Sequence, residues 1–134
     1  MSRKTFIGLV VAAAWASIIF IAYATLTRVG FVYEIYYKLS PYLMRPEMKN
    51  YAHLEHIIAF VFPGALFVLA YPRRIFLVCC IVLGAAALLE ILQTLTPDRH
   101  GTLLDAVEKM AGGAAGIFLA GATRRFWPGK SSIH

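Results

Sequence analysis

The chain has 134 residues, of which 60% are hydrophobic and 15% charged, and its mean hydropathy is +0.68. A soluble domain averages about 25% charged residues and has short apolar runs, so this composition indicates an integral membrane protein. The net charge of +6 is divided among several loops instead of forming one basic patch, so we expect no nucleic-acid partner.

An apolar run from about residue 5 to residue 26 follows a short basic start and predicts the first membrane span. Ala22, Tyr23 and Ala24 look like a signal-peptidase site, so a cleaved signal peptide is the alternative. The apolar core of about 19 residues is longer than the roughly 7 to 15 of a signal peptide, which favours a retained span.

The connection from residue 28 to residue 50 is rich in tyrosine, and Phe31, Ile35, Leu39 and Leu43 recur at helical spacing. Tyrosines between apolar spans are typical of the headgroup region. We therefore predict an interfacial helix ending near Pro41, with an aromatic ligand-binding loop as the alternative.

Three further spans are predicted at about 53–70, 75–95 and 103–123. Pro63 and Gly64 lie inside the first of these three, where a bundle tolerates them because neighbouring helices satisfy the freed backbone groups. The predicted fold class is an all-α integral membrane four-helix bundle in one domain, with an interfacial helix between the first two spans.

Seven of the 13 basic residues fall on one side of the four-span arrangement, where no acidic residue accompanies them. They are Arg3, Lys4, Arg73, Arg74, Arg124, Arg125 and Lys130. The positive-inside rule assigns this side to the cytoplasm. The sequence thus predicts a multi-pass protein of the bacterial cytoplasmic membrane with both termini in the cytoplasm.

Three of the predicted spans carry polar residues to the outer headgroup depth. These residues are His53, His56, Glu90, Gln93 and Asp105. Ionisable residues within spans are costly and usually face a cavity or each other, so a functional site is the default hypothesis. The alternative is a structural clamp in which Glu90 pairs with Lys109 or Arg99 and Asp105 caps the last helix.

On a helix, Asp105, Lys109, Gly112 and Gly116 form one stripe. Gly112 and Gly116 make a GxxxG motif, which permits close approach of a neighbouring backbone. We expect this motif to pack inside the bundle, with homo-oligomer formation as the alternative.

Read in order, these residues resemble the VanZ-like membrane protein family over about residues 53–120. The resemblance lies in an early-span histidine, a Glu-x-x-Gln, a Pro-x-Arg and an aspartate before a glycine-rich helix. The residues concerned are His56, Glu90, Gln93, Pro97, Arg99 and Asp105. Two positions depart from the family: Ala52-His53 stands where Asp-Lys is common, and Lys109 where asparagine is common.

The resemblance implies a small polytopic envelope protein, associated with low-level resistance to glycopeptide antibiotics such as teicoplanin. Our first hypothesis is a non-enzymatic accessory protein that binds a membrane lipid or a lipid-linked envelope precursor. Arg99 and Lys109 would hold phosphate, while Glu90 and Asp105 would orient them or accept hydroxyls. The predicted ligand-binding set is His56, Glu90, Gln93, Arg99, Asp105 and Lys109, with no resident metal or cofactor.

The second hypothesis is an intramembrane hydrolase or transferase acting on a lipid-linked substrate. His56 and Glu90 would serve as base and orienting group, or His56, Glu90 and Asp105 would hold a metal. The sequence offers no evident Ser or Cys nucleophile nearby and no HExxH motif. An oligomeric transporter with Glu90 as its titrating group ranks third, because the chain has no evident inverted repeat.

Overall fold

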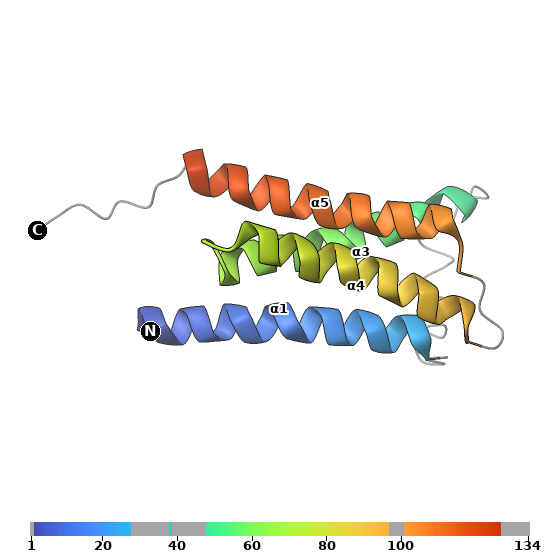
Figure 1. Cartoon of the computed structure of the whole chain (residues 1–134), viewed down its shortest axis with the longest axis horizontal. Helices are drawn as coiled ribbons and strands as arrows, with labels where there is room; N and C mark the ends of the chain where they lie inside the picture. The colour runs from blue at the N-terminus through green and yellow to red at the C-terminus, as the bar shows by residue number, and fades with distance from the viewer. Residues whose placement is uncertain (1, 28–37, 39–47, 97–100, 127–134) are drawn as a thin grey trace, which may run out of the picture.

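The computed structural model describes residues 2–27, 38, 48–96 and 101–126 (Figure 1). These residues contain the helices α1 (Arg3–Leu26), α3 (Met48–Ala70), α4 (Ile75–Thr94) and α5 (Leu103–Phe126). The all-α prediction is therefore confirmed. The predicted interfacial helix before α3 falls outside the described residues except at Lys38.

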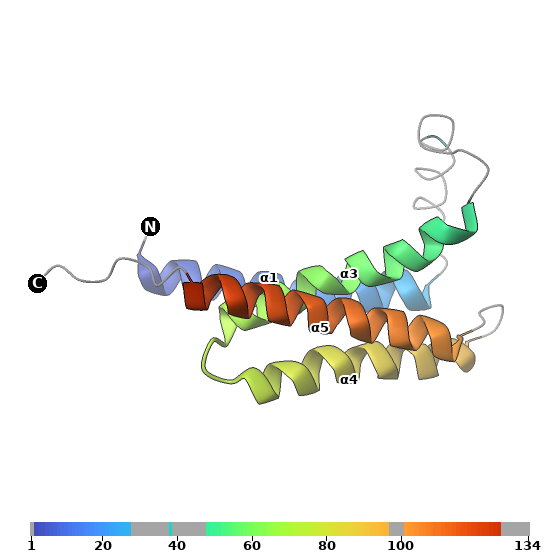
Figure 2. The same cartoon turned by 90° about the horizontal axis from the view of Figure 1, so that it is seen from above.

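The four helices run alternately in opposite directions (Figures 1 and 2). The start of α1, the turn from α3 to α4 and the end of α5 consequently lie at one end of the molecule. That end carries six exposed basic residues: Arg3, Lys4, Arg73, Arg74, Arg124 and Arg125. Their gathering at one end agrees with the expected separation of charge along the bundle.

Three of the helices are long and apolar enough to cross a membrane: α1, the part of α3 from His53 to Ala70, and α4. The fourth predicted span corresponds to α5, which is equally long as α1 but contains several glycines and five charged residues. These residues lower its hydropathy, so α5 does not meet the same criterion.

α1 begins two residues before its predicted span, and α3 and α5 extend further beyond theirs. α3 begins at Met48, within polar sequence. The predicted limit at residue 53 came from hydropathy, which marks where an apolar span begins and not where the helix begins. α5 continues through Arg124 and Arg125 to Phe126, where positive side chains complement the partial negative charge of a helix C-terminus.

Glycines bring the backbones of α3 and α5 into direct contact. A methyl group at Gly112 would overlap the carbonyl of Ile57, and one at Gly116 would overlap the carbonyl of Val61. Such close approach is the use of GxxxG that membrane helices favour. The expectation that this motif packs within the chain is confirmed.

The apolar core lies mainly between α3, α4 and α5, and its largest fully buried side chains include Phe60, Phe67 and Val82. Helix α1 packs against this core through Trp15, near the middle of the helix. The indole of Trp15 donates a hydrogen bond to the hydroxyl of Tyr71 at 3.1 Å and meets the ring of Phe67 edge-on at 5.2 Å.

Candidate functional site

At the end opposite the basic residues, polar side chains form two groups on different sides of α5. The first is the buried clamp, made of Glu90, Gln93 and Lys109 between α4 and α5. The second is the His–carboxylate cluster, made of His53, His56, Asp105 and Glu108 between α3 and α5.

Lys109 is the centre of the buried clamp. Its ammonium donates to Oε2 of Glu90 and, at 3.0 Å, to Oε1 of Gln93. Lys109 and Glu90 are only 3% and 5% exposed. Burial of one charge alone is unfavourable, whereas an opposite partner with additional hydrogen bonds compensates it. In the clamp, each of these two buried groups therefore has a partner of opposite charge.

Backbone groups complete the hydrogen bonding of the clamp. Oε1 of Glu90 accepts the N–H of Thr102 at 2.7 Å, and the amide of Gln93 donates to the carbonyl of Thr25 at 3.3 Å. Gly101 permits the first contact, because a Cβ there would lie 2.7 Å from the carbonyl oxygen of Glu90. Glu90 and Gln93 therefore link α4 to the start of α5 and the end of α1.

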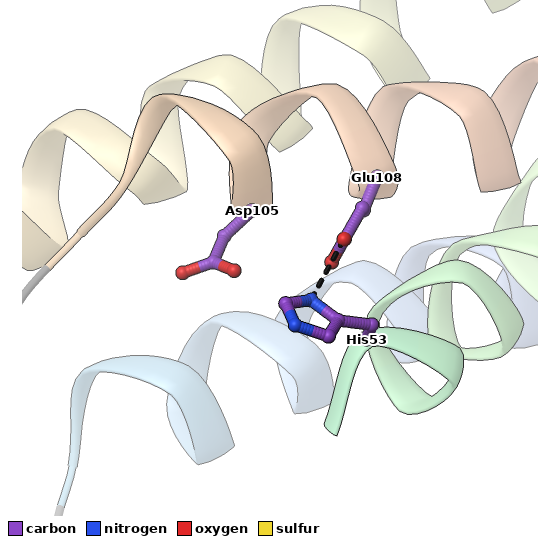
Figure 3. A group of neighbouring side chains, drawn as sticks. All are labelled: His53, Asp105 and Glu108. Carbon is purple, nitrogen blue, oxygen red and sulfur yellow. Dashed lines mark ion pairs between the residues drawn. The ribbon is translucent and has the colours of Figure 1, made fainter. Parts of the chain in front are cut away.

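The His–carboxylate cluster is more open to solvent. The exposed side-chain fractions are 46% for His53, 34% for His56, 19% for Asp105 and 14% for Glu108. Nδ1 of His53 lies 2.7 Å from Oε1 of Glu108. Figure 3 shows both carboxylates reaching from α5 toward this imidazole on α3.

His56 faces the same carboxylates. Its Nδ1 lies 3.4 Å from Oδ1 of Asp105 and 3.5 Å from Oε2 of Glu108. Within the described part of the chain, Nδ1 of His56 and Oε2 of Glu108 are buried atoms that have no hydrogen-bond partner, whereas Nδ1 of His53 has Oε1 of Glu108 at 2.7 Å. Buried polar atoms normally have such partners, so this cluster has unused capacity to bind a ligand.

Helical spacing explains why these four residues meet. His53 and His56 are three residues apart on α3, as are Asp105 and Glu108 on α5, and residues at this spacing share a helix face. The glycine contacts between α3 and α5 then bring the two faces together. The set His53, Asp105 and Glu108 has donor atoms within 4.8 Å of one another and could hold a metal ion.

The structure divides the predicted site between the two groups. His56 and Asp105 lie together, but Glu90, Gln93 and Lys109 form the separate clamp. The Glu90–Lys109 pair is the one expected from the structural alternative. The enzymatic hypothesis pairs His56 with Glu90, whereas in the structure Glu90 faces α5 from α4 and is engaged by Lys109 and Thr102.

The structural alternative gave the cap of the last helix to Asp105, which lies in the first turn of α5. Thr102 caps α5 instead: its hydroxyl accepts the N–H of Asp105 at 3.1 Å, which leaves the carboxylate of Asp105 to face His56 at 3.4 Å. Arg99, a predicted phosphate ligand, lies outside the described residues.

Sequence reasoning missed Glu108 and Thr102. Glu108 repeats on α5 the three-residue spacing of the two histidines, and this matching of intervals was the available signal. Thr102 directly precedes the helix that begins at Leu103, a position where threonine commonly caps.

Comparison of the chain with protein-family models, curated proteins and solved structures finds no match.

Proposed function

We propose that all four helices cross the bacterial cytoplasmic membrane and that both termini are cytoplasmic. Two observations support α5 as a span. It packs against α3 more extensively than against any other described helix, and its Lys109 is neutralised by Glu90. The exposed arginines at the opposite end of α5 satisfy the positive-inside rule in this orientation.

The protein's proposed role is that of an accessory membrane protein that binds the headgroup of a lipid or a lipid-linked envelope glycolipid at its outer end. The observation that carries this role is the His–carboxylate cluster. It combines partly exposed histidines with two buried polar atoms, Nδ1 of His56 and Oε2 of Glu108, that have no hydrogen bond among the described residues. Hydroxyl and amino groups of a headgroup would donate to Asp105 and Glu108, and charge-assisted hydrogen bonds of this kind are strong.

The buried clamp alters the first hypothesis about phosphate. Since Lys109 already donates to Glu90 and Gln93, we assign it to holding α4 against α5. Contact with a lipid phosphate is then left to Arg99, whose guanidinium suits bidentate binding. The resemblance to the VanZ-like family rests on the ordered residues alone and favours an envelope lipid as the ligand.

Lipid retention by the purified protein tests this role. The parent, an Asp105→Asn/Glu108→Gln variant and Arg99→Gln would be extracted in mild detergent, and the retained lipids identified by mass spectrometry. We expect one headgroup class to be enriched in the parent and reduced several-fold in both variants.

Arg125→Gln supplies a matched control for Arg99→Gln, because Arg125 is an exposed arginine of α5 at the opposite end of the bundle. The control should retain the lipid as the parent does. Retention proportional to total membrane lipid in all four proteins would exclude a headgroup site.

A further inference from the structure

The His–carboxylate cluster has the donor set of a transition-metal site. His53, Asp105 and Glu108 offer one imidazole nitrogen and two carboxylate oxygens within 4.8 Å of one another. His56 adds a second imidazole beside both carboxylates. Imidazole suits zinc and its neighbours in the first transition row, while purely oxygen sites suit magnesium and calcium.

The distances around His56 fit ligands of one ion better than they fit hydrogen bonds. Two ligand atoms of a tetrahedral zinc site, each about 2.0–2.1 Å from the metal, are about 3.3 Å apart. Nδ1 of His56 lies 3.4 Å from Oδ1 of Asp105 and 3.5 Å from Oε2 of Glu108. Neither contact is a hydrogen bond, since Nδ1 of His56 and Oε2 of Glu108 have no such partner among the described residues.

The charge of the cluster points the same way. Two carboxylates face two imidazoles, and the nearby cation Lys109 is engaged by Glu90. A divalent cation would neutralise the carboxylates and supply a partner for Nδ1 of His56 and Oε2 of Glu108, which have no hydrogen bond among the described residues. The exposed fractions of His53 and His56 leave a route for an ion from the aqueous phase.

We propose that His53, Asp105 and Glu108, with His56 as the fourth donor, bind one zinc-type divalent ion between α3 and α5. The contact of 2.7 Å between His53 and Glu108 would open slightly to admit the ion. Two ligands come from α3 and two from α5, so the ion would cross-link these helices. The cross-link lies on the N-terminal side of Gly112 in α5, next to the close contact of Gly112 with Ile57. The ion would use the same two carboxylates, Asp105 and Glu108, that we assign to a headgroup. The site is therefore a further use of the cluster, and its test measures metal binding without any lipid.

The test uses the full chain without a polyhistidine tag, stripped with chelator in detergent, in a Cys79→Ala/Cys80→Ala background that removes thiol ligands. Zinc would be titrated by calorimetry, and bound metal counted by elemental analysis. We expect one zinc per chain and a rise in melting temperature with zinc, since a ligand that binds the folded state stabilises it. A folded parent without stoichiometric zinc would overturn the site.

Single substitutions localise the metal. His53→Asn and Glu108→Gln should each weaken zinc binding by more than about 10-fold, the loss typical even for groups that only support a ligand. Arg125→Gln, at the other end of α5, should bind zinc as the parent does, and circular dichroism would verify that each variant is folded. Unchanged affinity in folded Glu108→Gln would show that the ion binds elsewhere and refute the proposal.

Cobalt replaces zinc as a spectroscopic probe, and its bands in the parent report the coordination number directly. Visible bands of the intensity expected for four-coordinate cobalt in the parent would support the assigned donor set. His56→Ala should change these bands while some binding remains. Bands typical of the six-coordinate aqueous ion would contradict the site, as would complete displacement of zinc by a modest excess of magnesium.

Discussion

The ammonium of Lys109 on α5 donates to the carboxylate of Glu90 on α4, and both side chains are almost completely buried. Opposite charges attract strongly where water is excluded, but each charge has first to lose its hydration. For this reason a buried pair contributes little compared with apolar residues of the same shape, whereas loss of one partner leaves an uncompensated charge. The pair should thus behave as a unit.

Removing one member of this pair is predicted to destabilise the bundle. Lys109→Met leaves Glu90 without its cation and should lower the free energy of unfolding by about 3–5 kcal/mol. The Glu90→Gln/Lys109→Met double variant removes both charges and keeps an oxygen acceptor for the N–H of Thr102. It should recover most of that loss. Denaturation in mild detergent, followed by circular dichroism, measures both values.

Lys4→Met serves as the comparison for this pair, since it also replaces a lysine by methionine but at an exposed position. Its effect should stay within about 0.5 kcal/mol, as for most surface substitutions. If the loss in the double variant equals the sum of the losses in Glu90→Gln and Lys109→Met, each measured alone, Glu90 and Lys109 do not act as a unit.

Glycine substitutions should separate close helix contacts from intrinsic helix preference. At Gly116 an added methyl group meets the carbonyl of Val61, so Gly116→Ala should cost about 1–3 kcal/mol through overpacking. At Gly121 nothing lies within 4 Å of the added Cβ. Gly121→Ala on the same helix should therefore be neutral or stabilising by up to about 1 kcal/mol.

Thermal unfolding of the two alanine variants in one detergent provides the comparison. Equal stability of both variants would mean that the backbones of α3 and α5 do not touch at Gly116. A loss confined to Gly116→Ala would support the close contact, because the two substitutions share the same chemistry and the same helix.

Sequence periodicity and hydropathy predicted the helices well, because apolar runs of span length dominate this chain. The ends of α1 and α4 lie within two residues of the predicted limits. The start of α3 at Met48 was missed, since a helix can continue through polar sequence where hydropathy falls. The charged residues and glycines of α5 lower its mean hydropathy, so a hydropathy criterion does not select it as a span despite its length.

The candidate site was predicted as a region but not as a set of contacts. The sequence placed His56, Glu90 and Asp105 at one end of the bundle. It could not show that Glu90 lies on a different side of α5 from His56 and the Asp105 carboxylate. That division depends on the rotation of α5 about its axis, which the glycine contacts with Ile57 and Val61 determine. Tertiary packing, and not local spacing, therefore decides that Glu90 meets Lys109 while Asp105 meets His56.

The cap of α5 gives a smaller and more local prediction. The hydroxyl of Thr102 accepts the N–H of Asp105 at 3.1 Å. Thr102→Val keeps the shape but removes this acceptor, and should reduce the free energy of unfolding by about 1 kcal/mol. Thr102→Ser retains a hydroxyl and should be nearly neutral. Equal losses in the two variants, measured by thermal denaturation, would argue against the cap.

The orientation of the bundle leads to a prediction about labelling from outside the cell. In a background without Cys79 and Cys80, single cysteines would replace Leu95, which is 75% exposed at the end of α4, and Arg73, in the exposed turn before α4. The two positions lie at opposite ends of the bundle (Figure 1). A membrane-impermeant maleimide should therefore label Leu95→Cys in intact spheroplasts and label Arg73→Cys only after the membrane is opened. The reverse pattern would invert the proposed topology and move the His–carboxylate cluster to the cytoplasmic face, where an envelope headgroup in the outer leaflet could not reach it.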